Sequence, residues 1–308
     1  FNKFNKWFRK RNNRMREPRT IDVLLLILLG AIWGSAFFNI KIATYTYDPI
    51  TLVFVRVFFA LMALAIYCAY RNVKILAFSK DWKIYALVGL TNITIPFLLI
   101  AYGTNVVDSY LSAILMSTTP LSGTLLAHFF TSNEKLNFFK SIGVIVGFMG
   151  VLFLFFDKLV ITETNIFYVI VILCGSTFYV VGGILTLKFL KNKGNENVTT
   201  STILWSLIFL FPFCLYQEPW VNLNPSMEST IALIYLGIFP TGIAWLLRFH
   251  ILTKVGMVFQ TQVAYLIPIF GVIFGYIIMG EQITWKVLAS LIIIISGIYI
   301  VKRGNKGI

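Results

Sequence analysis

Arg56 is a charged residue inside an otherwise apolar stretch, where it could bind an anion. It follows Pro49 by seven residues, so in a membrane-crossing helix it lies about 10 Å below the surface at 1.5 Å per residue. An ionisable side chain at mid-helix costs about 2.5–3.5 kcal/mol on insertion scales, so it needs a partner. Two interpretations stay open. Arg56 forms a structural clamp with Asp48, Asp108 or helix-end carbonyls, or its planar guanidinium faces a cavity and binds a carboxylate or phosphate.

Arg248 is the second such cation, and it lies two residues before His250 near the inner end of a later apolar stretch. A topology or gate contact is its ordinary role, and an anion contact at the inner mouth is the alternative. Lys41, near the outer end of the first apolar stretch, can snorkel to the surface. Acidic residues fall only at the ends of these stretches, so a buried carboxylate relay is not expected. We therefore expect weak or indirect coupling, such as facilitated exchange, with Asp108 the best candidate if a proton is involved.

Uncharged polar side chains cluster beside prolines in several apolar stretches. Proline frees backbone carbonyls, which in lipid must be satisfied by protein or water, so such clusters can line a cavity. Hydrogen bonding between helices is the alternative, at under about 2 kcal/mol for each bond. The clusters are Asn92 and Thr94 before Pro96, Ser117 to Thr119 before Pro120, and Gln260, Gln262 and Tyr265 before Pro268.

Aromatic residues inside the apolar stretches complete the candidate site, because they can stack on a solute or hold an ammonium by cation–π attraction. The residues expected to contact a solute are Trp33, Asn39, Arg56, Asn92, Tyr102, Ser117, Thr118, Tyr179, Trp245, Gln260, Gln262 and Tyr265. The residues expected to act as hinges or gates are Pro96, Pro120, Pro240, Pro268 and Arg248.

The elements that must position these residues are membrane-spanning helices. Hydrophobic residues make up 58% of the 308 positions and charged residues 12%, whereas a soluble domain carries about a quarter charged residues. This composition predicts an all-α integral membrane protein. We expect ten transmembrane helices, at 22–45, 49–70, 83–104, 108–131, 137–157, 165–188, 200–217, 229–250, 257–279 and 283–302.

The distribution of basic residues predicts the orientation of these helices. The net charge of +14 does not indicate nucleic-acid binding, because Lys and Arg gather in the connections. With the N-terminus inside, 22 of the 26 fall on the inner side and only Lys158 and Lys286 on the outer side. This asymmetry predicts a multi-pass protein of the bacterial cytoplasmic (inner) membrane with both termini cytoplasmic.

The first 20 residues form a basic cytoplasmic segment, which the apolar stretch after it marks as retained rather than as a cleaved signal. An amphipathic helix on the inner leaflet and a disordered basic tail are equally compatible with its composition. The aromatic residues spaced for such a helix are Phe1, Phe4, Trp7 and Phe8.

The sequence contains an internal repeat. The stretches 89–120 and 237–268 both run from a glycine through a span and a short turn to a proline, at a constant offset of 148. Further pairs at offsets of 145 to 147 are Gly30 with Gly175, Trp33 with Phe178, Glu134 with Glu281, and Gly150 with Gly297. We expect two five-helix repeats, 21–157 and 158–308, with the second inverted because five is odd, around a central cavity.

These residues resemble a known family. Trp33-Gly34-Ser35, followed by Phe37, Lys41, Pro49 and Arg56, is similar to the opening motif of EamA-type members of the drug/metabolite transporter superfamily. Ser-Asn-Glu at 132–134, in place of the commoner Leu-Gly-Glu, and a longer basic N-terminus depart from the pattern. The resemblance implies that the first four helices of each repeat surround the cavity, with the fifth and tenth outside. It also implies metabolite or amino-acid traffic, often export.

Enzymatic function is not expected. Two histidines far apart and acids at span ends supply no metal set and no nucleophile with a base. Cys68, Cys174 and Cys214 lie in apolar runs, where they act as small hydrophobes. We therefore expect no cofactor and no metal.

We expect a secondary transporter that moves an amino acid or related zwitterion or anion by alternating access, as an exporter or exchanger. A carrier of a cationic amine or of a nucleotide-like solute such as S-adenosylmethionine is the alternative within transporters. A non-transporting membrane subunit or receptor is the alternative of another class. The expected partners are the solute and the lipid bilayer, not nucleic acid, with the chain a monomer or weak homodimer.

Three glycines at helical spacing, Gly143, Gly147 and Gly150, predict a face where two helices pack closely.

Overall fold

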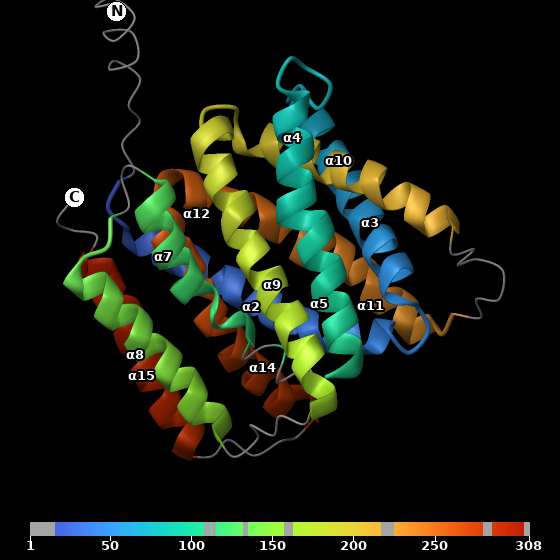
Figure 1. The fold of residues 1–308 in the computed structure, drawn as a ribbon. Helices are drawn as coiled ribbons and strands as arrows, with labels where there is room; N and C mark the ends of the chain where they lie inside the picture. The colour runs from blue at the N-terminus through green and yellow to red at the C-terminus, as the bar shows by residue number, and fades with distance from the viewer. Residues whose placement is uncertain are drawn as a thin grey trace, which may run out of the picture.

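The computed structural model describes residues 16–107, 112, 115–131, 135–156, 163–216, 225–279 and 285–304. Several positions singled out in the sequence lie outside these residues, namely Phe1, Phe4, Trp7, Phe8, Asp108, Glu134, Lys158 and Glu281. The described residues form helices and the turns between them (Figure 1).

The chain makes ten helical passes within the described residues, five in each half. The first half contains α2 (Thr20–Ala43), α3 (Pro49–Tyr70), a third pass of α4 (Trp82–Gly89), η1 (Leu90–Thr94) and α5 (Ile95–Val106), then α7 (Thr119–Phe130) and α8 (Phe138–Phe155). The second half contains α9 (Glu163–Leu185) with η3 (Thr186–Leu190), α10 (Asn195–Tyr216), an eighth pass of α11 (Met227–Leu236), η4 (Gly237–Ile243) and α12 (Ala244–Lys254), then α13 (Met257–Thr261), α14 (Val263–Met279) and α15 (Trp285–Gly304).

Six segments of the described residues are long and apolar enough to cross a membrane by themselves. They are Thr20–Ala43, Pro49–Tyr70, Trp82–Val106, Ile166–Leu190, Asn195–Tyr216 and Met227–Lys254. Two shorter apolar helices, Phe138–Phe153 and Met257–Gly271, belong to the remaining passes. The chain is an all-helical, multi-pass membrane protein of two five-helix halves, as its composition predicts.

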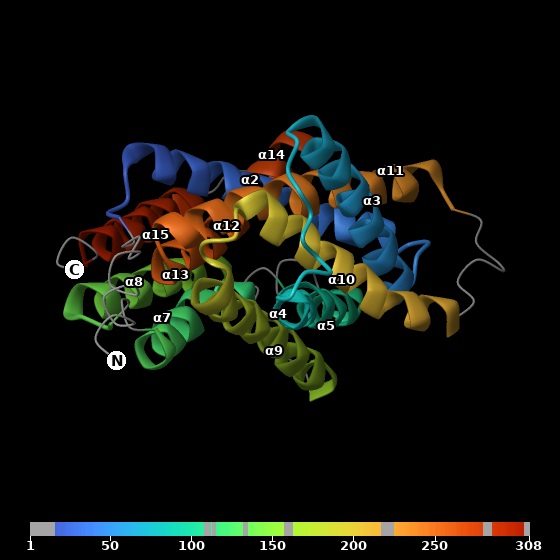
Figure 2. The same cartoon turned by 90° about the horizontal axis from the view of Figure 1, so that it is seen from above.

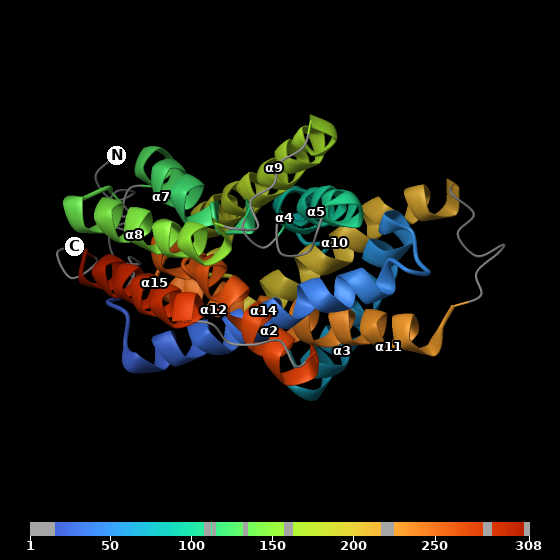
Figure 3. The same ribbon diagram turned by 90° about the horizontal axis from the view of Figure 1, so that it is seen from below.

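The two halves pack in matching pairs. Helix α2 lies against α11 and α14 of the second half, and α9 lies against α5 and α7 of the first half. The second helices of the halves, α3 and α10, pack on each other, as do the fifth helices, α8 and α15. The α8–α15 pair stands side by side at one end of the molecule in all three views (Figures 1, 2 and 3). This exchange of equivalent contacts is what an inverted repeat produces.

Helix α10 begins at Asn195, five residues before the expected start at 200. Its first turns are polar, so hydropathy does not mark them, yet they are buried against α3 and α4. The hydroxyls of Thr199, Thr200 and Thr202 donate to the carbonyls of Asn195, Glu196 and Val198, which removes the cost of burying them.

The fourth pass also differs from the expected single helix at 108–131. Residues 117 and 118 form a turn, and α7 starts at Thr119 with Pro120 in its first turn. Proline is tolerated at this position, because the first amides of a helix have no partner within it. Met116 and Thr119, on either side of this turn, line the cavity described below.

The third and eighth passes each contain a wide helical turn, η1 and η4, at corresponding places in the two halves. Pro240 lies inside η4, and Pro96 follows η1 in the first turn of α5. A proline ring clashes with the carbonyl four residues earlier and donates no hydrogen bond, so the helix must widen or kink there. The turn η4 bonds to two residues of the candidate site, Trp33 and Arg56, through the carbonyl of Pro240 and the hydroxyl of Thr241.

An arginine and aromatic cavity between the two halves

A partly open cavity lies among the helices of both halves, and its volume for the centres of water-sized molecules is about 70 Å³. The α8–α15 pair contributes none of its lining residues, nor does α10. The lining residues are Trp33, Ala36, Phe37, Ile40, Arg56, Phe97, Ile100, Met116, Thr119, Tyr179, Trp245, Arg248, Gln260, Thr261, Val263, Ala264 and Ile267. Both intramembrane arginines therefore face one cavity.

Arg56 is held in the cavity wall by a chain of bonds that begins at a proline. Pro240 leaves the carbonyl of Leu236, four residues earlier, without its usual amide donor. The hydroxyl of Thr241 donates to that carbonyl at 2.8 Å, and Arg56 Nε donates to the same hydroxyl oxygen at 2.6 Å. The carbonyl of Pro240 also accepts from the indole nitrogen of Trp33 at 2.9 Å. The break in the eighth pass thus positions two cavity residues from the first half.

Asp48 does not pair with Arg56. Its Oδ1 accepts from the backbone amides of Ile50 and Thr51 at 2.9 and 3.1 Å, and it also bonds the Thr51 hydroxyl. Asp48 therefore caps the first turn of α3, which is the ordinary role of an aspartate at that position. Thr241 is the hydrogen-bond partner of Arg56 among the described residues.

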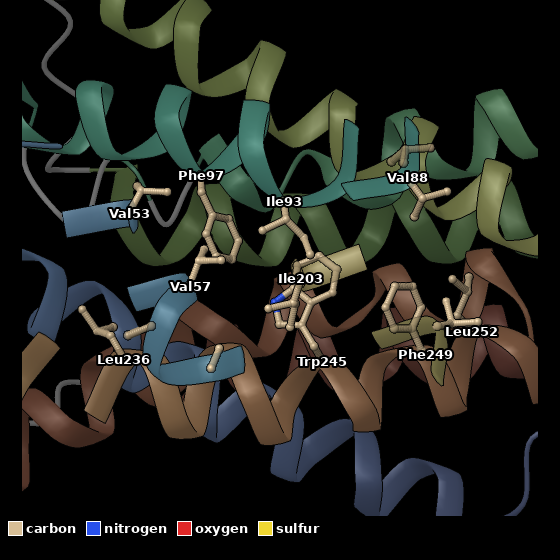
Figure 4. Packing of buried hydrophobic residues seen from close by; sticks show 14 of the residues in the cluster. Val53, Val57, Val88, Ile93, Phe97, Ile203, Leu236, Trp245, Phe249 and Leu252 are labelled. Atoms are coloured by element: carbon tan, nitrogen blue, oxygen red, sulfur yellow. The ribbon is translucent and has the colours of Figure 1, made fainter. Parts of the chain in front are cut away.

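Three aromatic rings pack on one another at the centre of the cavity. The ring centroids of Phe97, Tyr179 and Trp245 lie 5.9 to 6.3 Å apart in all three pairs. They come from α5, α9 and α12, so this aromatic triad joins the two halves. Figure 4 shows Phe97 and Trp245 within the surrounding apolar core. The triad supplies flat apolar surface for a solute.

The two arginines flank the aromatic triad. The guanidinium carbon of Arg56 lies 4.2 Å from the centroid of Phe97, and that of Arg248 lies 4.6 Å from the centroid of Trp245. Both contacts are in the range of a cation–π interaction. The arginines are 7% and 2% exposed, so each brings a positive charge into a nearly dry site.

Arg248 has an unused hydrogen-bond donor. Its Nη2 donates to the carbonyl of Tyr179 at 3.1 Å, whereas its buried Nη1 has no hydrogen-bond partner among the described residues. Nearby, Gly183 makes room for the Met257 side chain, because a Cβ there would lie 2.2 Å from it, whereas the same Cβ would make only an ordinary contact of 3.6 Å with Arg248 Nη2. Beyond Arg248, towards the end of α12, Phe249 and Leu252 are fully buried (Figure 4).

No Asp or Glu is among the described residues that line the cavity. Within the described part of the chain, the ion pairs are Arg16–Asp22 and Lys193–Asp81, near the helix ends. These residues also include no group of three His, Cys, Asp or Glu side chains that could hold a metal ion. The lining is therefore rich in donors and poor in acceptors, which suits a ligand with oxyanions.

Six of the residues expected at the site come together in the cavity. They are Trp33, Arg56, Tyr179, Trp245, Gln260 and Arg248. Arg248 was assigned a gate role from the sequence, and the structure places it in the cavity wall beside the aromatic triad.

Seven other expected contact residues do not line this cavity. Most bond to backbone carbonyls, as with Ser117 to Ala264, Thr118 to Leu115 and Tyr265 to Val144. Tyr102 is 42% exposed at the surface of α5. The remaining three are Asn39, which donates to Ser35, Gln262, which donates to Val258, and Asn92, which is fully buried near Gly182.

None of the four expected hinge prolines is among the residues that line the cavity. Pro96 and Pro120 lie in the first turns of α5 and α7, Pro240 lies within η4, and Pro268 lies within α14. Pro240 acts on the site indirectly, through Thr241 and Trp33.

Phe97 is the member of the aromatic triad that the residue types alone did not reveal. The signal was present, because Phe97 and Trp245 are related by the repeat offset of 148. Applying that offset to the intramembrane tryptophan would have identified its partner in the triad.

A cavity between two inverted halves of a helical bundle is the arrangement of a secondary carrier. The profile of the EamA-like transporter family matches residues 20–156 and again residues 166–303. The chain belongs to this family, within the drug/metabolite transporter superfamily. It is a membrane transporter and not an enzyme.

Relatives of this chain match it over most of its length. It is 21% identical to the uncharacterized transporter YoaV of Bacillus subtilis, over 91% of this chain and 96% of that one. It is 28% identical to an uncharacterized transporter in the trpA 3′ region of Buchnera aphidicola, over 92% and 93%. It is 24% identical to protein PagO of Salmonella typhimurium, over 90% and 91%. A crystal structure with 15% sequence identity shares the fold at a TM-score of 0.78, over 94% of this chain and 100% of that one.

Proposed function

We propose that this transporter moves a small organic anion or an amino-acid-like zwitterion by alternating access. The observation that carries the proposal is the pair of buried arginines in one cavity whose described lining has no carboxylate. A buried charge without a partner costs several kcal/mol, so the site gains most from an occupant with negative charge.

A cationic amine or an S-adenosylmethionine-like solute is disfavoured by the same observation. The aromatic triad could hold a cation, but Arg56 and Arg248 already lie against two of its rings. A second cation in this low-dielectric space would meet repulsion from both guanidinium groups.

The transport cycle we propose rocks one half against the other about the broken third and eighth passes. The termini lie on the cytoplasmic side of a bacterial inner membrane, as the excess of basic residues on that side predicts. The protein acts as an exporter, as the family resemblance implies, or as an exchanger, which the lack of a carboxylate for a proton relay among the described cavity residues supports. It works as a monomer or weak homodimer.

Replacing Arg56 with glutamine tests the proposal. Glutamine keeps a donor near Thr241 but removes the charge. The affinity for an anionic solute should fall roughly tenfold to hundredfold, because a hydrogen bond to a charged group is worth about 1.5–3 kcal/mol. The measurement is a thermal-shift screen of purified protein with amino acids, organic acids, amines and nucleosides, followed by counterflow in liposomes.

Lys41→Gln is the matched control, because Lys41 is a basic residue of the same membrane region that does not line the cavity. It should bind and carry the solute as the unaltered protein does. If a cationic solute is carried and Arg56→Gln improves its binding, the anion proposal is wrong. If no solute of any class is carried by well-folded protein, the carrier function itself is contradicted.

A further inference from the structure

We propose that the solute carries two anionic groups separated by a short spacer, one for Arg56 and one for Arg248. This inference rests on the proposed anion transport and narrows its substrate class. A dicarboxylate, or an acidic amino acid with a carboxylate at each end, has the required chemistry.

The charge of the cavity requires two negative groups. The two guanidinium groups are buried, and none of the described lining residues is acidic. A monoanion leaves one arginine without a counter-charge, and a neutral zwitterion leaves the net charge of the site unchanged. A solute with two anionic groups neutralises both arginines, which is the arrangement that buried charges require.

The positions of the two arginines require a spacer between the anionic groups. Arg56 lies seven residues into α3, and Arg248 lies six residues before the end of α12. Since these helix ends lie on opposite sides of the membrane, the arginines sit about 10 Å in from opposite faces at 1.5 Å per residue. Arg56 lies over Phe97 and Arg248 lies over Trp245, and the centroids of these two rings are 5.9 Å apart. Two anionic groups joined by a short spacer can therefore meet both arginines, one group at each ring.

The free donors of the cavity support two-point binding. Arg248 Nη1 is buried and has no hydrogen-bond partner among the described residues. Arg56 uses Nε for Thr241, and its two terminal nitrogens have no hydrogen bond within the same described residues. A guanidinium offers two parallel donors to a carboxylate, so each arginine can take one carboxylate group of the solute.

The repeat shows that the arginines are not demanded by the fold. A Cβ on Gly237 would lie 2.8 Å from the carbonyl of Arg56, and a Cβ on Gly89 would lie 2.6 Å from the carbonyl of Thr202. Thr202 therefore stands in the second half where Arg56 stands in the first. Arg248 corresponds to Ile100 at the offset of 148. The backbone contact at Arg56 is thus repeated with a threonine, and the repeat position of Arg248 holds an isoleucine, so neither repeat position requires an arginine.

Pairs of solutes that differ in one charge test the proposal on the unaltered protein. Glutarate and its half-amide have nearly the same size and shape, as do glutamate and glutamine. Dissociation constants from thermal-shift titration should be at least roughly tenfold lower for the solute with the additional carboxylate, because each charged contact contributes separately. Equal affinities within both pairs would overturn the proposal.

The variants Arg56→Gln and Arg248→Gln then assign the contacts. Each should lower the affinity for the dianion more than the affinity for the half-amide, so that the preference for the dianion is lost, and Lys41→Gln should keep the preference. Persistence of the full preference in both variants would overturn the proposal. Tight binding of the half-amide only in the presence of chloride would also overturn the proposal. Chloride would then neutralise the second arginine in place of a second anionic group on the solute.

The outcome also separates this inference from the proposed function. If monoanions bind and are carried as well as dianions, anion transport stands and the two-anion inference fails. If neither monoanions nor dianions bind while another class of solute does, both proposals fail. Binding and counterflow of the dianion, lost in the arginine variants, supports both.

Discussion

Replacing Gly297 with alanine is expected to lower the stability of the protein strongly. A Cβ at this position would lie 2.5 Å from the backbone nitrogen of Gly147 and 2.7 Å from the carbonyl oxygen of Gly143. These are backbone atoms of α8, so relief requires the helices to move apart. Overpacking of this kind typically costs about 1–3 kcal/mol and sometimes more. The melting temperature in detergent, followed by size-exclusion chromatography, should fall by several degrees, or no folded protein should be recovered.

Gly271→Ala is the control for this prediction. Gly271 also lies in a membrane-spanning helix, α14, and a Cβ there would meet no atom within 4 Å. Its melting temperature should match that of the unaltered protein. Equal stability of Gly297→Ala would show that the α8–α15 pair does not depend on this close approach.

The role of the glycines of α8 could be predicted from their spacing, but their partner could not. Gly143, Gly147 and Gly150 recur at helical spacing, which indicates a face where another helix comes close. The structure puts Gly143 and Gly150 against α15, and Gly147 against both Gly297 of α15 and Tyr265 of α14. Which helix fills such a face depends on the arrangement of the whole bundle, and periodicity within one helix does not contain that information.

The cavity could be predicted in part. Residues that carry a charge or an aromatic ring inside an apolar span are costly or unusual there, so Arg56, Trp245 and Tyr179 could be found from type and position. Depth along one helix does not tell which side chains face each other. For this reason Arg248, near the inner end of its pass, could not be placed beside the same aromatic triad as Arg56 by sequence reasoning.

Polar residues beside prolines were harder to place. The hydroxyl of Thr118 donates to the carbonyl of Leu115 three residues earlier, so it needs neither a cavity nor a solute. Gln262 donates to the carbonyl of Val258 in the same way, but its buried Oε1 has no hydrogen-bond partner among the described residues. Thr241, which was not singled out, uses the same kind of bond to position Arg56. The sequence marks where a proline frees a carbonyl, but only the packing shows which hydroxyl fills it.

Replacing Arg248 with methionine is expected to reduce transport by a large factor without lowering the stability of the ligand-free protein. In the solute-bound state the variant removes one partner of a buried charged contact. Such truncation costs about 2–5 kcal/mol, roughly 30-fold to several-thousand-fold in affinity. Counterflow at a solute concentration near the dissociation constant of the unaltered protein should therefore be undetectable.

The stability of this variant distinguishes a binding role from a structural one. Arg248 donates one hydrogen bond, to Tyr179, and lies over Trp245. The hydrogen bond is worth about 1.5–3 kcal/mol, and the cation–π contact is worth up to about 2 kcal/mol. Burying the charge costs several kcal/mol, so the terms nearly cancel. The melting temperature of Arg248→Met should thus equal or exceed that of the unaltered protein. A fall as large as that of Gly297→Ala would identify Arg248 as a structural clamp. Unchanged stability with lost transport means that the protein retains a buried charge for its solute.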